Sequence, residues 1–335
     1  MNMQNRLGQA IGQVAESQLS VDAAGTGLIL PGPRGLAKPL LIMEPARLWF
    51  LSAVVVYGIG MLYSIFIWRR GFQQQNWVPF VLLAVAFAFH TAALVSRGFS
   101  LNHCPVNNLY EATAFVLWTI SLGSLVFGLW PRLRFLGVFT APLLFCVGVF
   151  AMMPGLDPEY GDKPQFINGW SSLHAALIML GYGSFGLSAV AGSMFLTQER
   201  SLKLHRASAL FNLLPPIQRL EKLITYALIA GLILLTAGLA IGGVYLELPE
   251  GTSFWRDSKV VWSLLVWLFY AALLLAHLRF DQRGRRYAWL AIIAFCFVIL
   301  TFWGTNLLSG IHNPCLLYTS PSPRDLSTSR MPSSA

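Results

Sequence analysis

The sequence predicts an all-α protein, a polytopic transmembrane bundle of about eight helices. Of its 335 residues, 56% are hydrophobic and only 11% are charged, whereas about a quarter of the residues are charged in soluble domains. The apolar runs are about 20 residues long, which is the length a helix needs to cross a hydrocarbon core of about 30 Å. Basic residues lie mostly in alternate loops between these runs. Together these observations indicate a bundle of helices in lipid.

Eight apolar segments, each bounded by Arg, Lys, Pro or Gly, are the expected spans. They cover residues 47–68, 78–96, 109–130, 133–153, 171–197, 223–246, 259–279 and 287–308. The turn before the third segment contains His103 and Cys104, followed by Asn107, Asn108 and Glu111. Because asparagine side chains are favoured at helix N-caps, we expect Asn107, Asn108 and Glu111 to cap the third span.

The loops after the first, third, fifth and seventh spans carry most of the positive charge. They contain 13 basic residues: Arg69, Arg70, Arg132, Arg134, Arg200, Lys203, Arg206, Arg219, Lys222, Arg279, Arg283, Arg285 and Arg286. The three opposite loops contain Arg97, Lys163, Arg256 and Lys259. By the positive-inside rule, both termini are extracytoplasmic in a multi-pass protein of the bacterial cytoplasmic membrane. The net charge of +9 then reflects topology, and no nucleic-acid partner is expected.

Two histidines lie at the outer ends of the expected spans. An imidazole in a membrane segment is costly and is by default a functional hypothesis. His174 begins the fifth span and His312 follows the eighth on the same outer side, so the two could hold a haem iron between them without a covalent bond. The alternative is that each is an interfacial histidine hydrogen-bonded to a neighbour. His277, near the cytoplasmic end of the seventh span, is too shallow to pair directly with the deeper His90.

An outer aromatic segment, residues 253–267, lies between the spans that carry the two outer histidines. Its candidate binding residues are Trp255, Arg256, Asp257, Lys259, Trp262 and Trp267. Flat indole rings suit a porphyrin plane, and the basic side chains can pair with haem propionates. The ordinary aromatic belt of a membrane interface explains the tryptophans equally well. Helical spacing allows Trp255 and Trp262 to share a face but separates Trp262 from Trp267.

Motifs for several classes of enzyme are absent from the sequence. It contains no GxSxG, Walker loop, HExxH or CxxCH pattern, so hydrolases, nucleotidases, zinc proteases and self-attached cytochromes lack support. Any catalysis would involve haem or a partner. The four cysteines have no zinc spacing, although a disulfide between Cys104 and Cys315 is conceivable. No inverted repeat and no paired intramembrane charges stand out, which weakens a transporter interpretation.

The two ends of the chain differ from its centre. Residues 1–46 are mixed in composition and form neither a clean signal peptide nor a span, and Met43 could be the true start. The stretch 315–335 switches abruptly to Ser, Thr, Pro and Arg and resembles translated vector sequence. We therefore expect an N-terminal extension, a transmembrane domain over 47–312 and a foreign tail.

Three stretches carry a family resemblance that spans residues 47–312. They are HCPVNNLYEATAFVLW, GWSSLHAALIMLGY and LTFWGTNLLSGIH. They are similar to segments of the cytochrome c assembly membrane proteins, a family with CcsA/ResC and HemX branches. The mark of that family is a tryptophan-rich external WWD segment between external histidines, and 253–267 stands in its place.

The resemblance implies a function in c-type cytochrome maturation by system II. It implies that His174 and His312 are axial ligands of a haem b presented outside, and that the WWD segment cradles this haem. It also implies that His277 matches a histidine of an inner haem site. The protein would work with a CcsB/ResB-like membrane partner and pass reduced haem to the CxxCH cysteines of an apocytochrome c, at most as the membrane subunit of a haem lyase.

The WWD segment departs from the family pattern. Asp257 aligns, but Phe254 and Arg256 flank Trp255 where two tryptophans are usual. The stretches LFNLLPPIQRLEKLI and AHLRFDQRGRR look more like the HemX branch, which is linked to control of haem biosynthesis. The external His312 favours the CcsA branch. We therefore expect haem delivery, with a HemX-like regulator and a small-molecule or ion transporter as the alternatives.

Overall fold

The helices lie close to the positions that the sequence predicts. The computed structural model describes residues 44–69, 77–101, 108–131, 133–157, 169–203, 215–245, 258–280 and 283–308. The chain divides into the units 1–43 and 44–335, and every described residue belongs to the second. The elements are α2 Pro45–Arg69, α3 Trp77–Leu101, α4 Leu109–Gly128, α5 Leu136–Ala151, the 3-10 turn η1 Pro154–Leu156, α6 Gly169–Lys203, α8 Ile217–Tyr245, α9 Ser258–Arg279 and α10 Arg285–Leu308. The described part of the chain contains no strand, so the all-α prediction is confirmed.

Seven of these helices are long and apolar enough to cross a membrane, and the eighth, α5, is a shorter apolar helix of 16 residues. At 1.5 Å per residue α5 is about 24 Å long, which is less than the hydrocarbon thickness of about 30 Å. The chain continues from it through η1. Helix α6 is longer than predicted, with 35 residues and a length of about 52 Å. The bundle of about eight helices is therefore confirmed.

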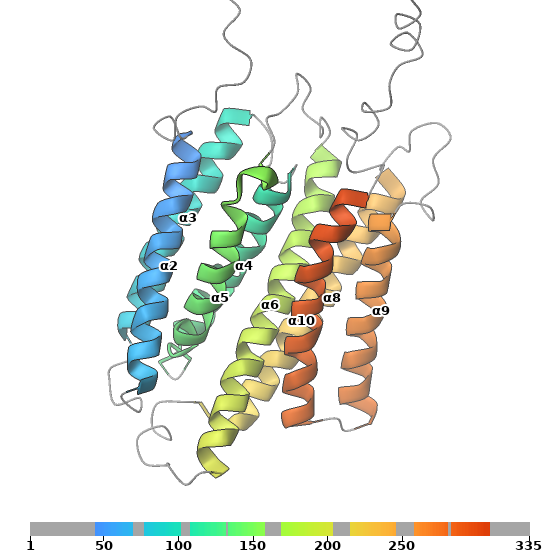
Figure 1. Cartoon of the computed structure of the whole chain (residues 1–335). Coiled ribbons are helices and arrows are strands. Elements are labelled where there is room, and N and C mark those ends of the chain that lie inside the picture. The colour runs from blue at the N-terminus through green and yellow to red at the C-terminus, as the bar shows by residue number, and fades with distance from the viewer. Residues whose placement is uncertain are drawn as a thin grey trace, which may run out of the picture. The chain divides into compact units, whose positions relative to one another are not determined.

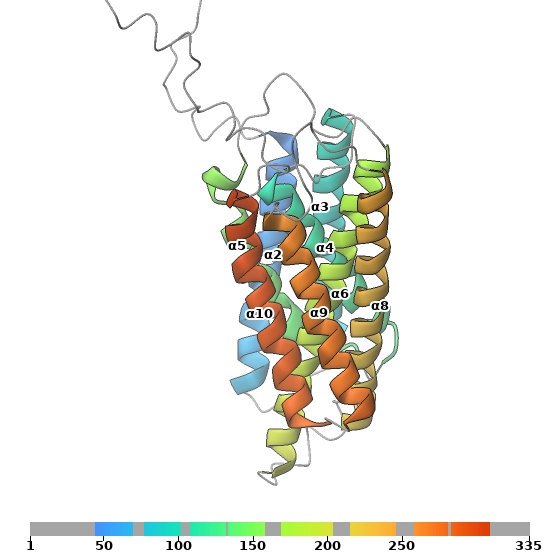
Figure 2. The same cartoon turned by 90° about the vertical axis from the view of Figure 1, so that its right-hand side faces the viewer.

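The helices form two groups of four, α2 to α5 and α6 to α10 (Figure 1). In the view turned by 90°, α8, α9 and α10 cover the near face and α2 to α5 lie behind them (Figure 2). Successive helices run in opposite directions, so α2, α4, α6 and α9 begin at one end of the bundle. We call this the His174 end, since His174 lies in the first turns of α6, and the opposite end the His277 end.

Glycines allow the closest helix contacts. A Cβ atom at Gly181 of α6 would lie 3.1 Å from the carbonyl oxygen of Gly231 in α8. In lipid, helices associate through close packing, because apolar burial supplies little driving force there. Large apolar side chains such as Leu62, Ile233 and Leu268 are exposed on the outside of the bundle. Their exposure is what a surface in contact with lipid tails requires.

The start of α4 matches the expected cap. Asn108 has an extended backbone, and its side-chain oxygen accepts a hydrogen bond from the backbone N–H of Glu111 at 2.8 Å. This satisfies one of the N–H groups that the first turn of a helix leaves unpaired. The capping prediction is therefore confirmed for Asn108, whereas His103, Cys104 and Asn107 lie outside the described residues.

Candidate functional site

His174 is held against helix α8. Its Nδ1 atom lies 2.7 Å from the carbonyl oxygen of Gly238. A carbonyl oxygen only accepts hydrogen bonds, so Nδ1 carries the hydrogen and donates it. In a neutral imidazole of this tautomer the lone pair is on Nε2, which is the form in which histidine binds a metal through Nε2. The half-buried ring is therefore oriented by the backbone of a second helix.

A glycine lies directly beneath this ring. A Cβ atom at Gly242 would lie 2.5 Å from Cε1 of His174 and 2.6 Å from its Nδ1, which is closer than atoms can approach. Slightly further towards the end of the bundle, the rings of Trp170 and Tyr245 stack at 4.3 Å with planes 4° apart. Sequence reasoning missed these glycines, although AGLAIGGVY places Gly238 and Gly242 one helical turn apart.

The two tryptophans of α9 face different neighbours. The ring of Trp262 lies 5.1 Å from that of Phe297 in α10, and the indole N–H of Trp267 donates to the hydroxyl of Thr236 in α8 at 2.8 Å. The prediction that they do not line one surface is confirmed. Lys259 lies in the first turn of α9, at the His174 end.

The other predicted residues of the outer site are Trp255, Arg256, Asp257 and His312. All four lie outside the described residues. The second axial ligand and the aromatic platform therefore stay predictions. Within the described part of the chain, the outer site consists of His174, the glycines Gly238 and Gly242 that lie against its ring, and the start of α9.

A buried ionic network lies at the same end of the bundle. The guanidinium of Arg97 in α3 donates from Nε to Glu111 at 2.9 Å and from Nη2 to Asp157 at 2.8 Å. It also pairs with Glu44, which directly precedes α2. Only 7% of the Arg97 side chain is exposed, and Glu111 is fully buried. The network joins four segments of the chain, and Arg97, which the sequence predicts to lie in a loop, belongs to helix α3.

Asp157 makes this network sensitive to pH. Burial raises the pKa of its carboxyl above the ordinary aspartate value, while Arg97 and Arg47 act in the opposite direction. Because the folded-state pKa is above the unfolded value, the contribution of Asp157 to stability increases as the pH falls through the folded pKa. Above the folded pKa, where the carboxyl is charged, its burial costs stability.

The variant Asp157→Asn tests this balance. Because it removes the buried charge, we expect it to be at least as stable as the unchanged protein at neutral pH. This advantage should shrink as the pH falls through the folded pKa. Thermal unfolding in detergent across that range measures it, with Glu199→Gln, an exposed-pair variant, as the control. If Asp157→Asn instead lost more than about 1 kcal/mol of unfolding free energy at neutral pH, the ion pairs of Asp157 would stabilise the protein by more than its burial costs.

His277 occupies a polar cluster at the opposite end. Its Nε2 lies 3.3 Å from the hydroxyl of Thr225, and its Nδ1 lies 3.9 Å from a carboxylate oxygen of Glu221. Its ring stacks on Tyr287 at 4.1 Å. The cluster ties α8, α9 and α10 together, and both ring nitrogens face protein groups. A role of His277 in an inner haem site stays a prediction.

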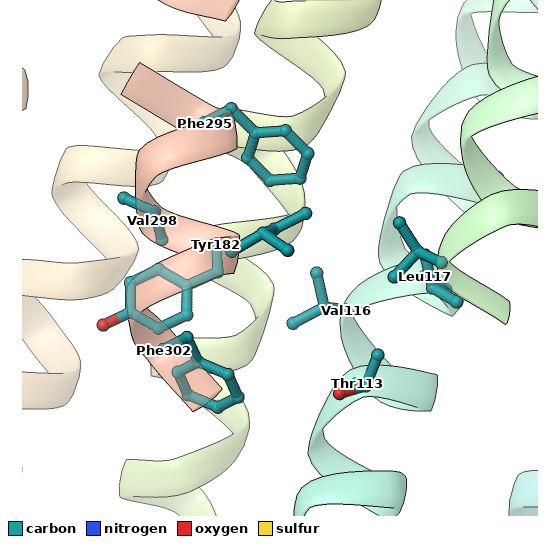
Figure 3. A pocket seen from close by; sticks show the side chains of 9 residues that line it. Thr113, Val116, Leu117, Tyr182, Phe295, Val298 and Phe302 are labelled. Atoms are coloured by element: carbon teal, nitrogen blue, oxygen red, sulfur yellow. The ribbon is translucent and has the colours of Figure 1, made fainter. Parts of the chain in front are cut away.

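A small apolar cavity lies between the two groups of helices. It is lined by side chains of α4, α5, α6 and α10, among them Val116, Tyr182 and Phe302 (Figure 3). Its volume is about 20 Å³, enough for a water molecule but far too small for a porphyrin. The cavity is therefore not a candidate site for haem, and the candidate site is the His174 end of the bundle.

The fold and these arrangements define a multi-pass helical membrane protein with an oriented imidazole at one end of its bundle. A family model described as cytochrome C assembly protein matches residues 106–312, which is more than half of the chain. The chain belongs to this family, and it is a membrane protein of cytochrome c biogenesis. The matched region contains His174, His277 and His312.

Curated relatives agree with the family. The chain is 30% identical over 261 residues to the cytochrome c biogenesis protein CcsA of a Prochlorococcus marinus strain, covering 69% of this chain and 83% of the relative. It is 27% identical over 266 residues to CcsA of Prochlorococcus marinus subsp. pastoris, covering 72% and 84%. It is 32% identical over 246 residues to protein NrfI of Wolinella succinogenes, covering 70% of this chain but 26% of NrfI.

Proposed function

We propose that this protein binds haem b non-covalently at the His174 end and delivers it for attachment to c-type apocytochromes. The observation that carries the proposal is the hydrogen bond from Nδ1 of His174 to the Gly238 carbonyl. Histidines that bind metals commonly donate their other ring N–H to a backbone carbonyl or a carboxylate, which fixes the tautomer and raises the basicity of the ligating nitrogen. The imidazole of His174, held against Gly238 and Gly242, therefore fits the role of an axial haem ligand.

The remaining members of the proposed site come from the sequence. His312 would be the second axial ligand, with Trp255 and Asp257 in the aromatic platform. Arg256 and Lys259 would pair with the propionates, a charge-assisted contact that is strong when partly desolvated. The bound haem would supply the iron and the two vinyl groups that become thioethers in a c-type cytochrome.

The basic residues support an orientation with the His174 end outside the cytoplasm. Of the 13 described basic residues, ten lie at the His277 end: Arg69, Arg134, Arg200, Lys203, Arg219, Lys222, Arg279, Arg283, Arg285 and Arg286. At the His174 end, Arg47 and Arg97 contact carboxylates. The positive-inside rule then makes the His277 end cytoplasmic. Haem at His174 would therefore face the compartment outside the bacterial cytoplasmic membrane.

The proposed partners are a CcsB/ResB-like membrane protein and an apocytochrome c with a CxxCH motif. The match to NrfI supports a further protein component, because the matched region is only 26% of that relative. In NrfI the region is thus joined to much more sequence in one chain. The relatives are named for cytochrome c biogenesis, which favours delivery over a HemX-like regulatory role or transport.

The variant His174→Ala tests the ligand assignment. The purified protein should show the visible spectrum of low-spin haem with two histidine ligands, and the substitution should abolish it because one axial ligand is lost. Added imidazole should restore the low-spin spectrum if the site is otherwise intact. The control is His205→Ala, which removes the histidine between Lys203 and Arg206 in the basic loop predicted after the fifth span. This variant should leave the spectrum unchanged. An unchanged spectrum in His174→Ala would refute the assignment.

A further inference from the structure

Helix α8 does more than pack against α6 at the His174 end. We propose that Gly242 is a positioning residue that fixes the tautomer and orientation of His174, so that Nε2 is presented to the haem iron. The inference rests on the proposed function of His174 as a ligand. It adds a residue on a different helix to the haem site, together with the atom of the imidazole that ligates.

Position 242 has no room for a side chain. A Cβ atom at Gly242 would lie 2.5 Å from Cε1, 2.6 Å from Nδ1 and 3.4 Å from Nε2 of His174. The Cε1–Nδ1 side of the imidazole thus occupies the space that a side chain would need. Any residue other than glycine must displace the ring, and a displaced ring loses the 2.7 Å contact between Nδ1 and the Gly238 carbonyl.

The carbonyl of Gly238 must remain accessible to His174. In an α-helix the carbonyl of residue 238 accepts the backbone N–H of residue 242, and its second lone pair can accept another hydrogen bond. A helical side chain leans towards the N-terminus and covers the turn before its own Cα. A side chain at 242 would therefore cover the carbonyl that His174 uses. Glycine leaves it accessible.

Helices α6 and α8 cannot easily separate to relieve the clash. Trp170 of α6 and Tyr245 of α8 stack at 4.3 Å near the same helix ends. A Cβ atom at Gly238 would itself lie 2.8 Å from Cγ1 of Ile178 and 3.4 Å from the carbonyl oxygen of His174. Close backbone contact at Gly238 holds the two helices together on one side of Gly242, and the aromatic stack holds them on the other, so the imidazole ring is the part that must move.

The chemical consequence follows from the tautomer. With Nδ1–H bonded to a carbonyl, Nε2 carries the lone pair and is a more basic ligand. A ring that leaves this carbonyl can adopt the other tautomer, in which Nε2 carries the hydrogen and cannot bind iron. Loss of the hydrogen bond also weakens donation to the iron, which raises the reduction potential of a bound haem.

The next residue provides a matched control for the experiment. A Cβ atom at Gly243 would meet nothing within 4 Å, so Gly242→Ala and Gly243→Ala make the same substitution at neighbouring positions of α8. In haem-loaded protein, Gly242→Ala should lower haem affinity about 10- to 100-fold, as losses of groups that orient a metal ligand do. Its remaining haem should show a raised midpoint potential. Gly243→Ala should match the unchanged protein in both measurements.

A second measurement needs no haem. Diethylpyrocarbonate modifies exposed, unprotonated imidazoles, and mass spectrometry reports the rate at His174 in haem-free protein. The displaced ring of Gly242→Ala should react several-fold faster, whereas Gly243→Ala should react at the original rate. Restoration of the low-spin spectrum by added imidazole, at an unchanged unfolding temperature, would show that Gly242→Ala has folded.

The outcomes separate the inference from the function on which it rests. If His174→Ala loses the haem spectrum but Gly242→Ala behaves as Gly243→Ala does, the positioning role is refuted and the ligand assignment stands. If His174→Ala keeps the spectrum, the ligand assignment fails, and presentation of Nε2 to haem fails with it. Equal modification rates of His174 in the two glycine variants would refute the steric argument independently of haem.

Discussion

Replacement of Arg97 by alanine should destabilise the protein by about 3–5 kcal/mol, as expected when one partner of a buried ion pair is removed. The guanidinium pairs with Glu111, which is fully buried, and with Asp157, whose side chain is 6% exposed. Both carboxylates would lose a charged hydrogen-bond donor in a site that water hardly reaches. Unfolding in detergent, by heat or denaturant, measures the loss.

An exposed ion pair at the other end of the bundle provides the control. Lys203 pairs with Glu199 at 2.7 Å, but 63% of the lysine side chain is exposed. Such pairs contribute about 0–1 kcal/mol, so Lys203→Ala should leave the stability nearly unchanged. The double variant Arg97→Ala with Glu111→Gln should recover part of the loss, because it removes one unpaired charge. A loss below about 1 kcal/mol in Arg97→Ala would mean that the network contributes little.

Substitution of Gly183 by leucine should separate the two groups of helices. A Cβ atom there would lie 2.4 Å from Cβ of Thr119 and 3.2 Å from the carbonyl oxygen of Val116, both in α4. Overpacking of a well-packed contact costs about 1–3 kcal/mol, and we expect the upper part of this range because helix backbone is involved. Contacts between α4 and α6 provide most of the interface between the groups. Unfolding in detergent measures the change.

Gly169→Leu is the matched control for this substitution. It lies in the same helix, and a Cβ atom there would meet nothing within 4 Å, so little loss is expected. Combining Gly183→Leu with Thr119→Gly removes the closest atoms and should restore part of the stability. Equal effects of the two leucine variants would contradict the steric argument.

The spans could be predicted from the sequence because their signal is local. Helix α9, Ser258–Arg279, begins one residue before the predicted segment 259–279 and ends with it. The cap of α4 is local as well, since Asn108 and Glu111 are three residues apart. The largest differences are at α6, Gly169–Lys203, and α8, Ile217–Tyr245, which extend beyond the predicted segments 171–197 and 223–246. Turns replace the predicted ends of the α5 segment, and α6 continues beyond the apolar run.

The candidate site could be predicted only in part. His174 was identified from its position at the end of a span. The residues that orient it were missed, because Gly238 is 64 residues away in the chain. A glycine one turn from another is common in membrane helices, and the sequence does not reveal which glycine faces an imidazole. Which glycine of α8 faces His174 depends on how α6 and α8 are rotated about their axes relative to each other.

Hydropathy and charge along the sequence are enough to predict a multi-pass helical protein with positive charge concentrated at one end. Hydrophobic length and charge decide how each segment partitions into lipid, and these are properties of the segment alone. The packing of the helices is needed to see that Arg97 is buried among carboxylates from three other segments and that Gly242 lies against the imidazole of His174. Such pairings depend on which helices pack and on how each is rotated, because a side chain can only meet what the neighbouring helix places opposite it.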